Sequence, residues 1–64
     1  MIYKLLDSQD QEKCIEIQIT SSQDIELTIY EHLQHSTEVN SVIIDKNNLY
    51  TLIGALHSIQ KQLN

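Results

Sequence analysis

The stretch DKNNLYTLIGALHSIQKQLN, residues 45–64, is the one long segment of this chain with helical periodicity. Asp45 is placed to act as the N-cap, because its carboxylate can accept hydrogen bonds from amides of the first turn and favours the positive helix end. Ile44 and Leu49 have the spacing of a hydrophobic staple. Apolar residues then recur along one side, over about 120° of the helix. We call them the apolar stripe: Leu49, Leu52, Ile53, Leu56, Ile59 and Leu63.

Three short segments before this helix alternate between apolar and polar residues, as half-buried strands do. They are residues 1–6, 14–20 and 25–30, and the polar turns 7–13 and 21–24 separate them. One register places their alternating apolar residues on a single face, and register is strongly specified where one face is buried. The pairs in this register are Ile19–Ile25, Ile17–Leu27, Ile15–Ile29, Leu5–Ile15 and Tyr3–Ile17, with Lys4 opposite Glu16 on the other face.

The segment EHLQHSTEVNS, residues 31–41, is compatible with a helical turn, a wide loop, or the end of one strand and the start of another. Residues 42–44 are apolar and β-branched and predict a strand that runs into the helix. The element order predicts an α+β fold, in which a meander of three to four antiparallel strands is covered on one face by the C-terminal helix. We expect one ββββα domain over residues 1–64. Since the chain has no Pro and one Gly, its turns must use Ser, Asp, Asn and Gln.

Size and charge restrict the partners. A chain of 64 residues with one Cys and neither Trp nor Phe is a small scaffold without disulfide bonds or a metal to stabilise it. Such scaffolds often oligomerise, so we expect a homodimer or a tight complex with another protein. The chain has nine acidic residues and four Lys, and its net charge is −5. Phosphate contacts come mostly from Lys and Arg, so nucleic acids and anionic membranes are disfavoured and a basic protein partner is favoured.

The location expected from the sequence is cytoplasmic. A lone Cys is typical of a reducing compartment. The N-terminus lacks a signal-peptide apolar run, and no segment approaches the length of a membrane span.

No residue pattern indicates an enzyme, a cofactor or a metal. His32 and His35 would share a helix face and could hold a metal with Glu31 or Glu38. An exposed polar loop explains this common spacing more simply. Cys14 lacks an activating base or cation among its sequence neighbours, so we expect it to be a small packing residue.

Two surfaces remain for partner binding. The outer sheet face carries carboxylates among more apolar residues than an exposed sheet needs, and one flank of the helix carries Gly54. A glycine there costs up to about 1 kcal/mol relative to Ala. Either another backbone or ring approaches it closely, or Tyr50 lies across it, or the glycine is the result of neutral drift. The residues that we expect in partner binding are Glu16, Glu26, Tyr30, Tyr50, Gly54 and His57.

The first functional hypothesis is a small acidic, non-enzymatic protein-binding module. One form of it is an inhibitor, in the style of small acidic phage and mobile-element proteins, that occupies a basic groove on a nucleic-acid-handling protein. The alternative starts from the order of four strands and a C-terminal helix, which resembles the transcriptional-coactivator family of single-strand binders. That resemblance implies a dimeric single-stranded nucleic-acid-binding or transcription-regulatory protein with curved sheets. Binding would then use bases stacked on tyrosine.

Overall fold

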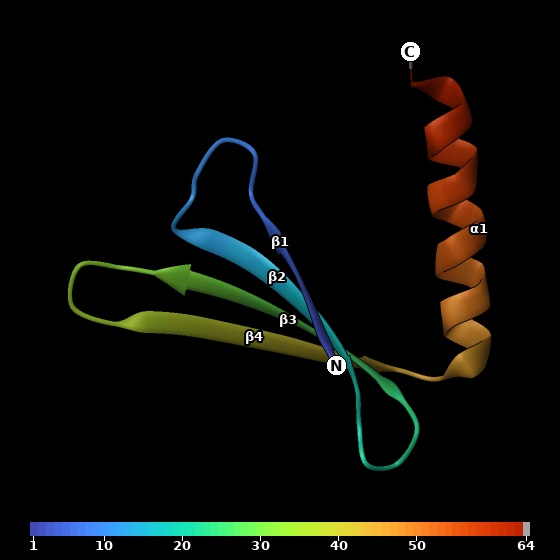
Figure 1. The fold of residues 1–64 in the computed structure, drawn as a ribbon, viewed down its shortest axis with the longest axis horizontal. Coiled ribbons are helices and arrows are strands. Elements are labelled where there is room, and N and C mark those ends of the chain that lie inside the picture. The colour runs from blue at the N-terminus through green and yellow to red at the C-terminus, as the bar shows by residue number, and fades with distance from the viewer. Residues whose placement is uncertain (64) are drawn as a thin grey trace.

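The computed structural model describes residues 1–63 as four antiparallel strands followed by one helix (Figure 1). The sheet has the order β1-β2-β3-β4, so neighbours in sequence are neighbours in space. This confirms the α+β fold with an antiparallel meander and a C-terminal helix. Asn64, the last residue of the predicted helical stretch, lies outside the described residues. The elements are β1 (Ile2–Leu6), β2 (Lys13–Ile19), β3 (Ile25–His32), β4 (Thr37–Ile44) and α1 (Lys46–Gln62).

The predicted register is confirmed at every pair, including Lys4 opposite Glu16 and Leu5 opposite Ile15. The segment that the sequence left open becomes the end of β3, a short loop and the start of β4. His32 faces Thr37 at the last pair of this hairpin. The amide of Leu33 then donates to the carbonyl of Ser36 at 2.8 Å across the loop.

Because side chains alternate along a strand, the register divides the sheet into two faces. The apolar face consists of Tyr3, Leu5, Ile15, Ile17, Ile19, Ile25, Leu27, Ile29, Val42 and Ile44, with Asn40 among them. The opposite face, which we call the mixed face, carries Ile2, Lys4, Leu6, Cys14, Glu16, Gln18, Glu26, Thr28, Tyr30, Val39, Ser41 and Ile43.

The turns are built from polar side chains, as expected of a chain almost without Gly and Pro. The carboxylate of Asp7 accepts from the backbone amide of Gln9 at 2.9 Å, and the carboxylate of Asp10 accepts from the amide of Glu12 at 3.0 Å. In the next turn the hydroxyl of Thr20 accepts from the amide of Asp24 at 3.1 Å. Gln23 closes this turn with a φ of 68°, a left-handed conformation that usually falls to Gly or Asn.

The helix begins as its sequence predicts. The Oδ1 of Asp45 accepts from the amide of Asn48 at 2.8 Å, so Asp45 is the N-cap. Ile44 and Leu49, the expected staple pair, are both half-buried. At the other end the amide of Leu63 donates to the carbonyl of Gln60 at 3.2 Å.

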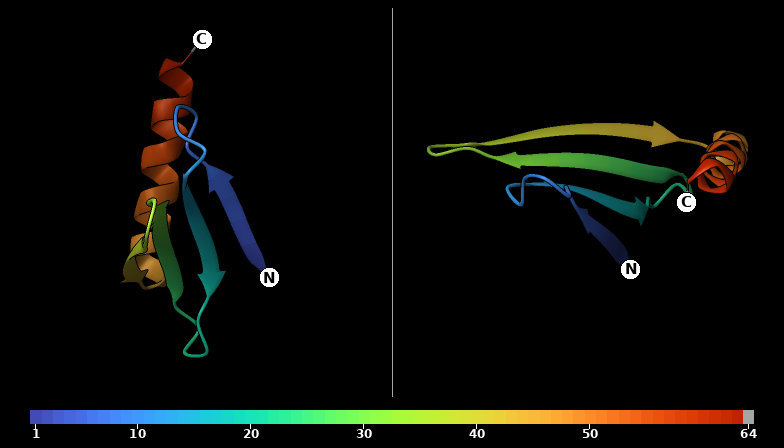
Figure 2. Two further views of the ribbon diagram at one scale, coloured as in Figure 1. Left: turned by 90° about the vertical axis from the view of Figure 1, so that its left-hand side faces the viewer. Right: turned by 90° about the horizontal axis from the view of Figure 1, so that it is seen from above.

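The helix does not cover a face of its own sheet, which differs from the expectation. It extends from the end of β4 at a steep angle to the strands, and its contacts with the sheet are mainly with β4 (Figures 1 and 2). The physical reason is the connection, because only Asp45 separates β4 from α1 and its backbone is extended. Connections that return a chain onto the preceding element usually have two to six residues.

The single chain consequently has almost no core. Among residues 1–63, only Cys14 and Thr28 are buried, at 6% and 5% exposure, and no residue of α1 is buried.

Candidate partner-binding surfaces

The mixed face is organised in three rows that cross the strands. The row beside the β1–β2 turn is apolar, the middle row is polar, and the third row is polar in the middle with an isoleucine at each end. In the order of the strands, the rows are Leu6, Cys14, Tyr30, Val39; then Lys4, Glu16, Thr28, Ser41; and then Ile2, Gln18, Glu26, Ile43.

The centre of the mixed face is tightly arranged. Thr28 and Ser41 share a hydrogen bond of 3.0 Å between their hydroxyl groups. The amide Nε2 of Gln18 donates to Oε1 of Glu26 at 2.7 Å, so this half-buried carboxylate is held in one orientation. Glu16 is also half-buried and lies between Lys4 and Thr28 in the register. The structure therefore brings two of the expected binding residues, Glu16 and Glu26, onto one ordered surface.

Tyr30 is the third expected residue on this face, and it belongs to the apolar row. It is half-buried and flanked in the register by buried Cys14 and by Val39, which is 53% exposed. Sequence reasoning did not place Val39 and Ile43 on this face. Residues 31–41 were left open between helical turn, loop and strand, and the strand predicted over residues 42–44 was given no register. The apolar–polar alternation that marks a strand is broken here, because polar Ser41 lies between Val39 and Ile43 on one side and polar Asn40 precedes Val42 on the other.

Positive charge is dispersed over the molecule. In the described part of the chain the single ion pair within 4.0 Å joins Nζ of Lys13 to Oε2 of Glu31 at 3.3 Å. The hydrogen bond and the charge of Glu31 raise the pKa of Lys13 above its ordinary value of 10.5. Lys4 lies on the mixed face, whereas Lys46 and Lys61 lie on α1. Within residues 1–63 the four lysines are therefore divided between the two faces of the sheet and α1.

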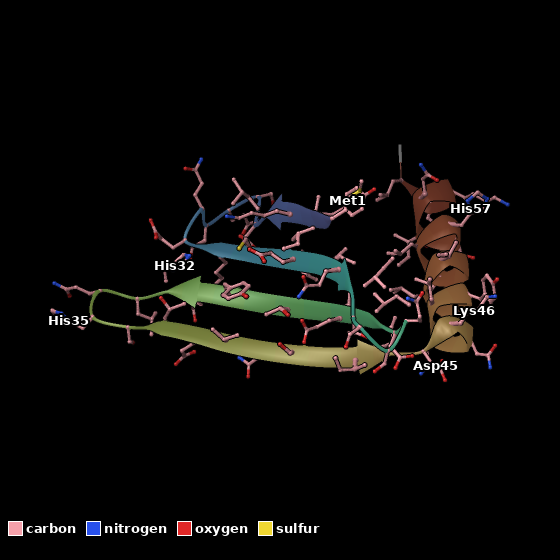
Figure 3. All side chains as sticks on the ribbon, turned by 60° about the horizontal axis from the view of Figure 1, so that its bottom comes forward. Met1, His32, His35, Asp45, Lys46 and His57 are labelled. Carbon is pink, nitrogen blue, oxygen red and sulfur yellow. The ribbon has the colours of Figure 1, made fainter. Side chains whose placement is uncertain are left out.

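The helix flank with Tyr50, Gly54 and His57 is separate from the mixed face. The labelled side chains His57 and Lys46 project from α1 on the side away from the sheet (Figure 3). A Cβ built on Gly54 would meet no atom within 4 Å. Tyr50 therefore does not lie across Gly54. Close approach by another chain and neutral drift remain as the explanations for this glycine. The six expected residues thus fall into two groups on different elements.

His32 and His35 do not form a site. His32 ends β3, and its Nδ1 lies 3.2 Å from the hydroxyl of Thr37, whereas His35 lies at the tip of the β3–β4 loop (Figure 3). Glu31, one of the two acids considered as a further metal ligand, forms an ion pair with Lys13. Within residues 1–63 no three His, Cys, Asp or Glu side chains gather in a way that could hold a metal ion.

Cys14 is a free thiol that is buried on the mixed face opposite Leu6, in agreement with a packing role.

Within residues 1–63 no helix combines the length and the apolar character needed to cross a membrane. Searches against protein-family models, curated proteins and solved structures give no match to this chain.

Proposed function

We propose that the protein is a non-enzymatic binding module whose mixed face docks on a basic protein surface. The observation that carries this proposal is the arrangement of that face. An apolar row that contains Tyr30 runs beside the polar middle row and the polar part of the third row. These polar groups include the half-buried carboxylates of Glu16 and Glu26. Protein interfaces combine an aromatic-containing apolar area with polar groups, and on this face the two areas lie side by side.

Charge indicates the kind of partner. The net charge is −5, and the mixed face holds Glu16 and Glu26 against the single cation Lys4. Complementary charge speeds encounter and discriminates against acidic partners. A basic groove of a nucleic-acid-handling protein fits this surface, which would make the module an inhibitor of the kind that phages and mobile elements encode. The free buried thiol of Cys14 suits a reducing compartment, and we place the protein in the cytoplasm.

The alternative, binding of single-stranded nucleic acid, needs cations along the path of the backbone and aromatic rings for the bases. The chain has no Arg, and Lys13 is already paired with Glu31. Its other lysines are divided between the mixed face and the helix. The protein-binding module is therefore the better-supported function.

The experiment compares two doubly substituted proteins with the same change in net charge. Glu16→Lys with Glu26→Lys alters the mixed face, whereas Glu12→Lys with Glu38→Lys alters an exposed turn and the far end of the apolar face. The partner is first identified by capture from the native host and purified, and its dissociation constant is then measured by calorimetry.

We expect the mixed-face variant to bind at least about tenfold more weakly, as losses of charge contacts at interfaces typically do. The control should bind about as tightly as the original protein. Equal losses in both variants would show that net charge alone is sensed, and no loss in either would exclude the mixed face as the site. A gel shift with single-stranded DNA at low salt provides the competing test, since retardation there would favour the nucleic-acid function instead.

A further inference from the structure

The largest unexplained feature of the molecule is the exposure of two apolar surfaces, the apolar face of the sheet and the apolar stripe of α1, in the described part of the chain. On the apolar face, Tyr3, Leu5 and Ile19 are 62%, 60% and 70% exposed. On the apolar stripe, Leu56 and Ile59 are 55% and 52% exposed. Exposed apolar patches of this extent are rare on soluble monomers and usually mark interfaces.

The two surfaces border one open angle between helix and sheet. Leu49 and Leu52, the half-buried residues of α1, both belong to the apolar stripe and lie at the end nearest the sheet. On β4, Ile44 of the apolar face is half-buried, whereas Ile43 of the mixed face is 53% exposed. Both observations indicate that the stripe lies on the side of α1 nearer to the apolar face of the sheet. Figure 3 agrees, because Lys46 and His57 point out of this angle.

The accessible surface area of the chain, compared with that of a compact monomer of the same mass, gives the excess area that is exposed. Its accessible surface is 5627 Å² for a mass of 7.4 kDa. A compact monomer of this mass exposes about 4,200 Å², so the excess is about 1,400 Å². The radius of gyration is 13.7 Å, against about 10.7 Å for a compact chain of this length. If two chains each covered this excess, their interface would total about 2,800 Å², within the range of obligate homodimers.

The dimensions of the two surfaces match each other. The 17 residues of α1 span about 25 Å, and the 8 residues of β3 or β4 span about 27 Å. Charged residues of the apolar side, Lys13, Glu31 and Glu38, are confined to the end far from the helix. A helix laid over a sheet face is a standard way to close a two-layer core. The single-residue connection at Asp45 keeps α1 from closing over its own sheet.

We propose that a second copy of this chain covers both surfaces, in a two-fold dimer that exchanges helices. The apolar stripe of each α1 lies on the apolar face of the other protomer's sheet. Such an isologous arrangement satisfies both surfaces at once and closes without a free apolar edge. The mixed faces remain outside, and so does the helix flank with Gly54, which lies on the other side of α1 from the apolar stripe.

The test uses one substitution at the centre of each surface. Leu56→Glu lies in the middle of the stripe, and Leu27→Lys lies in the middle of the apolar face, between Ile17 and Val42 in the register. Mass is measured by sedimentation equilibrium and secondary structure by far-UV circular dichroism. The original chain is expected at about twice 7.4 kDa at tens of micromolar. Each variant alone should raise the dimer dissociation constant at least about thirtyfold, since central interface residues carry most of the binding energy.

Mixing the two variants then distinguishes helix exchange from other dimers. In the mixed dimer one helix–sheet contact pairs the introduced glutamate with the introduced lysine, and the other contact keeps both leucines, so dimer mass and folded signal should return. In a helix–helix or sheet–sheet dimer the substituted residues would not meet in this way. A dimer that mixing fails to restore would overturn the exchange. A folded original chain at 7.4 kDa under these conditions would overturn the dimer itself.

Discussion

The substitution Leu56→Ala measures how much of the helix is covered in solution. In the single chain the side chain of Leu56 is 55% exposed, and it lies in the middle of the apolar stripe. Full burial of a leucine is worth about 1.5–3 kcal/mol, so the covered part in the single chain accounts for about 1 kcal/mol. Alanine is also a slightly better helix former than leucine, which reduces the loss further.

A helix that is covered by a second sheet gives a different magnitude. Leucine-to-alanine changes in a packed core cost about 2–5 kcal/mol per site, because the transfer energy and a cavity are both lost. Since both protomers carry the change, the loss per mole of dimer is about 4–10 kcal/mol. This range lies well above the value for the single chain, so the measurement separates the two states.

The assay is urea unfolding, followed by far-UV circular dichroism and tyrosine fluorescence, at two protein concentrations about a hundredfold apart. For a dimer that concentration ratio alone should stabilise the folded state by about 2.7 kcal/mol. Ser58→Ala is the control, because Ser58 lies about 200° round the helix from Leu56 and is exposed. A loss of about 1 kcal/mol for Leu56→Ala, with no dependence on concentration, would refute the exchange of helices.

Three further changes probe the elements that shape the single chain. Asp45→Ala removes the acceptor for the amide of Asn48 and should cost about 1 kcal/mol of unfolding free energy, measured in urea, with Asp45→Asn nearly neutral. Gln23→Gly should stabilise the protein by up to about 1 kcal/mol, because φ is 68° and glycine relieves a left-handed penalty larger than its own entropic cost; a lower melting temperature would contradict this. Because Glu31 raises the pKa of Lys13 in the folded state, the pair should stabilise the fold below pH 10.5 and lose that contribution as the pH rises through the folded-state pKa. Glu31→Gln should abolish this alkaline dependence in urea titrations at several pH values.

The sheet could be predicted because its information is local. The alternation of Ile15, Ile17 and Ile19 with polar residues fixes both the strand and its register. The helix start was equally readable, since the cap and the first turn involve only Asp45 and Asn48. Fourth-strand residues such as Val39 were harder to assign, because polar neighbours break the alternation and the short loop before them lacks Gly and Pro.

The placement of the helix was not predictable in the same way. An apolar stripe indicates that a helix packs against another apolar surface, but it does not indicate whether that surface belongs to the same chain or to another. We assumed the sheet of the same chain, whereas the length of the connection at Asp45 decides otherwise. The expected binding residues divide in the same way. Glu16, Glu26 and Tyr30 share one face through strand register, which the sequence predicted. The helix flank depended on tertiary placement and lies apart from them (Figure 3).

The distribution of charge supports different roles for the two sheet faces. Carboxylates occupy the turns, the helix cap and the mixed face, and on the apolar side only Glu31 and Glu38 occur, at one end. A chain that kept both faces in solvent would gain from carboxylates on either, because charge interrupts apolar patches and opposes aggregation. Their absence from the centre of the apolar face fits a surface that is covered as the protein folds. Their presence at Glu16 and Glu26 fits a face that stays in water until a partner of opposite charge arrives. An exchanged dimer presents two such faces, so a partner with two basic surfaces would be held more tightly than either contact alone provides.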